Sequence, residues 1–231
     1  LQNFDLCILE DNIFGSLVSL ESLNLENTFL EEIEDQAFAG LGELRELNLT
    51  GNRFETISCR VFLPLKKLKK LNLTYSVRTC ELNGLFTNLV SLESLDMSSS
   101  DLKSIGSEVF QGLDRLKELN LRSNWIEKLD AESFGDLKEL RELNLSENKI
   151  ETVEAGTFRR LAKLEELNLN GNQIKKLEKN SFDGLVSLKK LYLANPVENL
   201  SLEMFKGMEP HLECLMLDSQ FEENFEDKSR V

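Results

Sequence analysis

One spacing constrains this chain more than any other feature of its sequence. The motif Leu-x-x-Leu-x-Leu recurs every 24 residues, with Met97 once in place of the third leucine. It opens at Leu20, Leu44, Leu68, Leu92, Leu116, Leu140, Leu164, Leu188 and Leu212. A fixed period of about 20 to 50 residues is typical of a solenoid, in which each unit buries its apolar side chains against copies of itself. The sequence therefore predicts one elongated stack of repeats.

Each unit contains the pattern of one short strand. If the opening leucine is position 1, leucines at positions 4 and 6 alternate with exposed residues, which is the period of a strand with one buried face. All strands run in the same sense, so the sheet must be parallel, and nine strands span roughly 40 Å. Bulkier returning segments curve such a stack. We predict an α/β solenoid, a curved horseshoe with its sheet on the concave face and a mostly irregular convex side of 3-10 turns or short helices.

Two further columns complete the repeat. Phenylalanine stands at position 19: Phe14, Phe38, Phe62, Phe86, Phe110, Phe134, Phe158 and Phe182, with Phe205 displaced by one residue. A small polar residue stands at position 9: Asn52, Asn124, Asn148 and Asn172, or Thr28, Ser76 and Ser100, with Pro196 and Gln220 as poorer substitutes. An inward-pointing carboxamide can pair with backbone groups that the turn leaves open. We therefore expect a hydrogen-bonded ladder along position 9.

The 24-residue repeat predicts a single domain over residues 1–231, with about nine to ten repeats. Residues 1–19 form a partial first repeat and residues 212–231 a partial last one. Two units slip by one residue, with Val77 and Cys80 in one, and Val197 and Leu200 in the other, taking the apolar positions early. We interpret these slips as local irregularities and not as domain boundaries.

The full pattern, Leu-x-x-Leu-x-Leu-x-x-Asn-x-Ile-x-x-Leu with its phenylalanine column, covers nearly the whole chain. It resembles the extracellular 24-residue type of leucine-rich repeat, as in Toll-like receptor ectodomains and variable lymphocyte receptors. The resemblance implies a binding scaffold that holds a protein or other macromolecule on its concave or lateral face. It does not name the partner, because fold does not imply function. The cysteine-rich caps of extracellular relatives are missing from this sequence.

Composition narrows the partner class. The net charge of −14 argues against nucleic acid and anionic membrane, since both require a cationic patch. No apolar run approaches the 20 or so residues that a membrane span needs, so we expect no membrane insertion of this segment. The single histidine, His211, has no evident catalytic partner, and the cysteines have no metal-binding spacing. We expect no enzyme activity, no metal and no cofactor.

The four cysteines leave two interpretations open. Cys59 and Cys80 lie in adjacent repeats on the convex side and could form a disulfide. Alternatively, Cys80 is a small buried apolar side chain and Cys59 an exposed thiol. Cys7 and Cys214 lie too many repeats apart to reach each other.

Four glycosylation sequons begin at Asn48, Asn72, Asn144 and Asn199. In a secreted protein they would carry sugars, three of them on the concave sheet. The repeat also explains them without glycosylation, because an asparagine at position 5 followed by leucine is part of its pattern.

Candidate ligand contacts come from the variable positions of the concave face. Asp96, Glu118, Arg122, Trp125 and Glu142 form the main predicted cluster, and Tyr75 and Tyr192 are further candidates. An exposed tryptophan beside an arginine has the composition of an interaction hot spot. Trp125 could instead pack flat on its own turn. Glu118, Glu142 and Glu166 form an acidic column that would suit a basic partner, or would serve only solubility.

The sequence as a whole favours a non-catalytic protein-recognition module from an extracellular innate-immune or cell-surface receptor. One alternative is an adhesion or structural protein that forms homodimers or heterodimers. The other is an intracellular scaffold, in which the cysteines would be reduced and the sequons bare.

Overall fold

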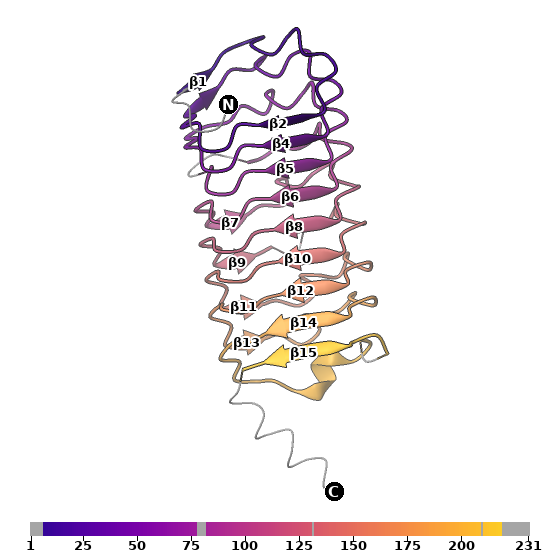
Figure 1. Cartoon of the computed structure of the whole chain (residues 1–231). Coiled ribbons are helices and arrows are strands. Elements are labelled where there is room, and N and C mark those ends of the chain that lie inside the picture. Colours follow the sequence, from indigo (N-terminus) through magenta and orange to yellow (C-terminus); the bar gives the residue numbers. More distant parts are fainter. Residues whose placement is uncertain (1–6, 78–81, 131, 209, 219–231) are drawn as a thin grey trace, which may run out of the picture.

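The main feature of the fold is one parallel sheet of nine strands stacked in sequence order (Figure 1). The computed structural model describes residues 7–77, 82–130, 132–208 and 210–218. The sheet strands are β2 (Ser22–Asn24), β4 (Glu46–Asn48), β5 (Lys70–Asn72), β6 (Ser94–Asp96), β8 (Glu118–Asn120), β10 (Glu142–Asn144), β12 (Glu166–Asn168), β14 (Lys190–Leu193) and β15 (Cys214–Leu217). In each adjacent pair of strands, a residue lies opposite the residue at the same position of the next repeat, as Glu142 lies opposite Glu166. The predicted parallel solenoid is confirmed.

A second row of two-residue strands lies beside the main sheet (Figure 1). These strands are β1 (Ile8–Leu9), β3 (Glu32–Ile33), β7 (Ser104–Ile105), β9 (Lys128–Leu129), β11 (Thr152–Val153) and β13 (Lys176–Leu177). They occupy positions 13 and 14 of their repeats, and the repeat pattern had indicated no strand there. The only helix in the described residues is the 3-10 turn η1 (Leu202–Phe205). The convex side is therefore irregular, as expected.

Buried rings of the phenylalanine column stack on one another from Phe14 to Phe62 and from Phe110 to Phe205. Ring centroids of successive phenylalanines lie 6.4 Å apart for Phe110 and Phe134, and 6.1 Å apart for Phe134 and Phe158. Phe205, displaced in sequence, still stacks on Phe182 at 6.3 Å. Each ring thus buries its faces against neighbouring repeats, which is why a single repeat cannot be stable alone.

The position-9 ladder is also confirmed. The Asn148 carboxamide donates to the carbonyl oxygens of Leu121 at 2.9 Å and Leu145 at 3.0 Å, and its oxygen accepts from the Ile126 N–H at 3.1 Å. Asn52, Asn124 and Asn172 repeat this arrangement. Each buried side chain therefore ties its own turn to the preceding repeat.

One assignment in the ladder needs correction. In the unit that opens at Leu188 the bond to the preceding repeat is made by Asn195, one residue before Pro196, which donates to the Leu169 carbonyl at 2.8 Å. The one-residue slip explains this. The repeat places its buried apolar residue at position 198, but the chain buries Val197 in that role, one residue earlier. The slip also leaves the Asn195 carboxamide oxygen buried without a partner among the described residues. Gln220 and Cys80 lie outside the described residues.

Candidate macromolecule-binding faces

The charged column at position 2 of the repeat is neutralised by its own neighbours. Glu93 lies between Lys117, at 2.6 Å, and Lys69, at 3.1 Å. Glu165 is held in the same way by Lys189, at 2.6 Å, and by Arg141. Hydrogen bonds from Lys117 and Lys69 hold the pKa of Glu93 below its ordinary value. Exposed pairs like these add little stability, about 0–1 kcal/mol each, but they leave little free charge for a partner.

The acidic column at position 3 differs, because its centre lacks such neighbours. Glu118, Glu142 and Glu166 stand side by side on β8, β10 and β12. Glu166 is paired with Lys190 at 3.0 Å, whereas no ion pair within the described part of the chain reaches Glu118 or Glu142. Partial burial, followed by repulsion from Glu118 and Glu166, raises the pKa of Glu142. The centre of the sheet therefore carries negative charge that the protein does not neutralise.

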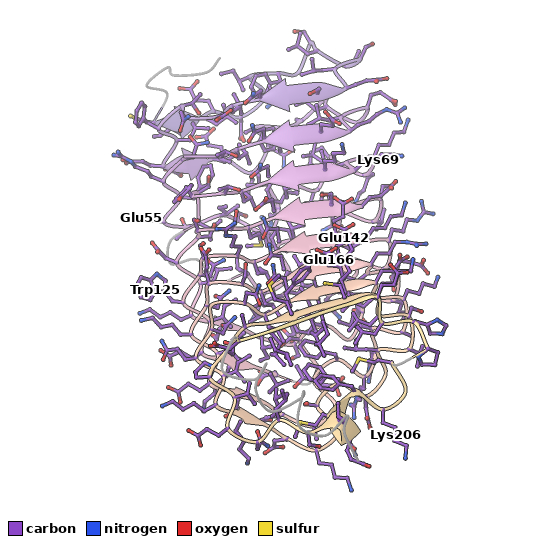
Figure 2. All side chains as sticks on the ribbon, turned by 60° about the horizontal axis from the view of Figure 1, so that its bottom comes forward. Glu55, Lys69, Trp125, Glu142, Glu166 and Lys206 are labelled. Carbon is purple, nitrogen blue, oxygen red and sulfur yellow. The ribbon has the colours of Figure 1, made fainter. Side chains whose placement is uncertain are left out.

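These carboxylates line a shallow hollow of about 290 Å³ across β6, β8, β10 and β12. We call it the acidic hollow; its polar lining is Ser94, Asp96, Glu118, Asn120, Glu142, Asn144, Glu166 and Asn168. Asp96 accepts hydrogen bonds from Asn120 at 2.9 Å and from the Ser98 hydroxyl at 2.6 Å. Figure 2 shows Glu142 and Glu166 next to each other between the two margins of the solenoid. The hollow thus presents carboxylates and amides on a rigid backbone.

A second depression, of about 490 Å³, lies at the edge where the sheet strands turn away. We call it the rim groove; its side chains include Tyr75, Asp101, Trp125, Glu147 and Lys149. It shares no lining residue with the acidic hollow. Figure 2 places Trp125 on the margin opposite Lys69.

Trp125 projects from this edge instead of entering the core. It is 46% exposed, its indole N–H donates to Asp101 at 3.1 Å, and the Lys149 ammonium lies 3.9 Å from the ring centroid. The ring is as exposed as a contact residue requires, and its role as a ligand contact stays a prediction. An aromatic ring held by polar neighbours and half in solvent suits a contact surface.

The predicted contact cluster divides between the two surfaces. Asp96, Glu118 and Glu142 line the acidic hollow, and Tyr75 and Trp125 line the rim groove.

The remaining two candidates line neither depression. Arg122 lies closer to the rim groove, since it pairs at 2.6 Å with Glu147, one of the groove residues. Tyr192 is half-buried on β14, opposite Asn168. The sequence pattern did not single out Asp101, Glu147 or Lys149. Lys149 follows Trp125 by one 24-residue period, and this spacing could have indicated the contact between Lys149 and Trp125.

Three of the four sequon asparagines lie on the sheet. The side-chain oxygens of Asn48, Asn72 and Asn144 accept from the backbone N–H two residues later, at 2.9–3.0 Å. Asn144 also lines the acidic hollow, so a sugar there would occupy it. Asn199 lies away from the sheet face and pairs through its carboxamide with the backbone of Leu177.

The cysteines, the possible metal ligands and the possible membrane spans form no site within the described residues. Cys59 is exposed, and its predicted partner Cys80 lies outside the described residues, so the disulfide stays a prediction. No group of His, Cys, Asp and Glu in the described ranges could hold a metal ion. No helix there is long and apolar enough to cross a membrane.

Comparison with known proteins settles the family. The leucine rich repeat model matches residues 6–54, 18–77, 45–102, 90–150, 114–174 and 139–196. The chain belongs to the leucine rich repeat family. A search of curated proteins found no match to this leucine-rich repeat protein.

Among solved structures, the crystal structure of a TLR13–ssRNA13 complex is similar, with a TM-score of 0.81 and 33% identity over 88% of the chain. The chain spans 29% of the length of that neighbour. This leucine-rich repeat protein therefore resembles part of a Toll-like receptor ectodomain.

Proposed function

We propose that this leucine-rich repeat protein is a non-catalytic recognition module of an extracellular receptor and binds a cationic macromolecule in the acidic hollow. The observation that carries the proposal is the unneutralised pair Glu118 and Glu142 on adjacent strands. Because the sheet fixes their backbone, little ordering entropy is lost on binding. A positive group of a partner would relieve the repulsion between them and provide electrostatic complementarity.

The similar structure contains a single-stranded RNA, but the charge of this chain favours a different partner. A net charge of −14 and an acidic hollow would repel a polyphosphate, which binds through lysine and arginine. A protein with a lysine- or arginine-rich surface fits better.

The hollow is tested with a fluorescent peptide of ten alternating lysine and glycine residues, titrated at fixed low salt. We expect the double variant Glu118→Gln, Glu142→Gln to bind it about tenfold more weakly, because both unpaired carboxylates are removed. The matched control is Glu43→Gln, Glu139→Gln, whose carboxylates are paired with Lys67 and Lys163. Both double variants remove two charges, from −14 to −12. Equal weakening in the two variants, or no binding by the native protein, would refute the hollow as the site.

The extracellular assignment is tested by the intact mass of the protein secreted from a eukaryotic host, before and after glycosidase treatment. We expect sugar at Asn48 and Asn72, and a bare Asn144, because a glycan at Asn144 would fill the acidic hollow. Site-by-site occupancy follows from peptide mapping. Sugar at Asn144 would contradict the binding site while supporting secretion; a wholly bare chain would favour the intracellular scaffold.

A further inference from the structure

The rim groove runs along the stack at the edge where the sheet strands turn away. Its lining comes from positions 8, 9 and 10 of consecutive units, those that open at Leu68, Leu92, Leu116, Leu140 and Leu164. The groove is therefore elongated and crosses several repeats. No sequon asparagine lines it, so a sugar attached to the chain would not be anchored inside it.

Two exposed aromatic rings give this polar groove its apolar surface. Tyr75 is 65% exposed and Trp125 is 46% exposed, and both line the groove. Phe29 is the one other exposed aromatic side chain within the described ranges, and it lies outside the groove. No leucine, isoleucine, valine, alanine or methionine lines the groove. A ligand therefore finds its apolar contacts on flat aromatic faces.

The charged groups of the groove are already engaged with neighbouring side chains. The Trp125 indole N–H donates to Asp101 at 3.1 Å, and the Lys149 ammonium lies 3.9 Å from the centroid of the Trp125 ring. Glu147 is paired with the guanidinium of Arg122 at 2.6 Å. Two carboxylates are thus offset by two cations, and the groove has no excess of either sign.

This arrangement is unsuited to three common classes of ligand group. A cation would compete with Lys149 for the Trp125 ring, and an anion would meet the carboxylates of Asp101 and Glu147. An aliphatic side chain would find no aliphatic wall to pack against. A neutral sugar ring fits, because its C–H groups pack on an aromatic face while its hydroxyls donate and accept hydrogen bonds.

Polar groups that suit sugar hydroxyls stand beside both rings. Ser99 and Asp101 belong to the unit between those of Tyr75 and Trp125, and Gln173 lies beyond Trp125. Neither the Ser99 hydroxyl nor the Gln173 carboxamide makes a hydrogen bond within the described part of the chain. Hydroxyl, carboxylate and carboxamide together offer both donors and acceptors to a ligand.

We propose that the rim groove binds a neutral oligosaccharide, whose sugar rings pack against Tyr75 and Trp125. Its hydroxyls bond to Ser99, Asp101 and Gln173. Tyr75 and Trp125 belong to units two repeats apart, so only a chain of several sugars reaches both. Neighbouring side chains hold the Trp125 ring in place, so little ordering entropy is lost on binding. The rim groove shares no lining residue with the acidic hollow, so this proposal and the proposed function can fail separately.

Trp125 is the only tryptophan of the chain, so its fluorescence reports directly on the groove. The probes are neutral hexasaccharides of α-linked glucose, β-linked glucose, mannose and N-acetylglucosamine, each titrated with fluorescence and with isothermal titration calorimetry. A sulfated heparin hexasaccharide is the anionic control. We expect saturable binding of at least one neutral hexasaccharide, and binding about tenfold weaker for its disaccharide, which reaches a single ring. The proposal is overturned if no neutral hexasaccharide binds, or if the heparin hexasaccharide binds as tightly.

Tyr75→Gly separates binding from folding. Glycine suits the φ of 56° at this position, so the variant should melt at the same temperature as the native protein or higher. Its affinity for the bound hexasaccharide should fall about tenfold, because one packing surface is lost. Phe29→Ala removes an exposed ring outside the groove and should keep native affinity, as should Glu118→Gln, Glu142→Gln. Native affinity in Tyr75→Gly, or an equal loss in Phe29→Ala, would also overturn the proposal.

Discussion

Replacing Phe134 with alanine is expected to lower the free energy of unfolding by about 3 to 5 kcal/mol. The ring is 1% exposed and lies between Phe110 at 6.4 Å and Phe158 at 6.1 Å. Its removal leaves a cavity in the middle of the stack, and the neighbouring rings are held by their own repeats and cannot collapse into it. Equilibrium urea unfolding, followed by circular dichroism, measures the loss.

Phe29→Ala is the matched control for this prediction. It removes the same atoms from a side chain that is 42% exposed, so the loss should be below about 1 kcal/mol. If the two variants lose equal stability, the phenylalanine column does not carry the core packing that the structure assigns to it.

Asn148→Ala is expected to cost about 2 to 4 kcal/mol, the second largest effect. The side chain is buried and is hydrogen-bonded to the carbonyl oxygens of Leu121 and Leu145 and to the N–H of Ile126. Alanine leaves these buried groups unpaired, and each such group costs about 1–3 kcal/mol unless water reaches it. Differential scanning calorimetry and urea unfolding both report the change.

Asn148→Ser tests whether the loss comes from hydrogen bonding. Ser76 and Ser100 serve the ladder at the same position in their own repeats, each donating to a carbonyl of the preceding repeat. Serine at 148 should therefore recover part of the lost stability. A serine variant as unstable as the alanine variant would show that the shape of the asparagine, and not its hydrogen bonds, matters.

Much of the candidate site could be predicted because the repeat assigns each residue a place. Glu118, Glu142 and Glu166 share position 3, so their alignment on neighbouring strands follows from counting residues. The position of Lys190 follows in the same way, because it shares position 3 and lies opposite Glu166 on the next strand. Lys190 reaches Glu166, whereas the described structure has no cation paired with Glu118 or Glu142.

The surface to which Tyr75 and Trp125 belong could not be predicted from the sequence. Tyr75 and Trp125 were correctly placed near the end of the strand, but they were grouped with residues of the sheet face. In the structure these two side chains line a separate groove together with Asp101 and Lys149. Backbone dihedral angles at these turns are not readable from the residue types, since Tyr75 occupies a conformation that favours glycine.

The 24-residue period was enough to predict the parallel sheet, the phenylalanine column and the asparagine ladder, because each repeat contacts only its neighbours and repeats their geometry. Where the period slips, the sequence frame pointed to Pro196 while the folded chain uses Asn195. The second row of short strands and the division of the contact cluster between two surfaces emerged from three-dimensional packing. They depend on side-chain reach and turn conformation between repeats, which a one-dimensional pattern does not specify.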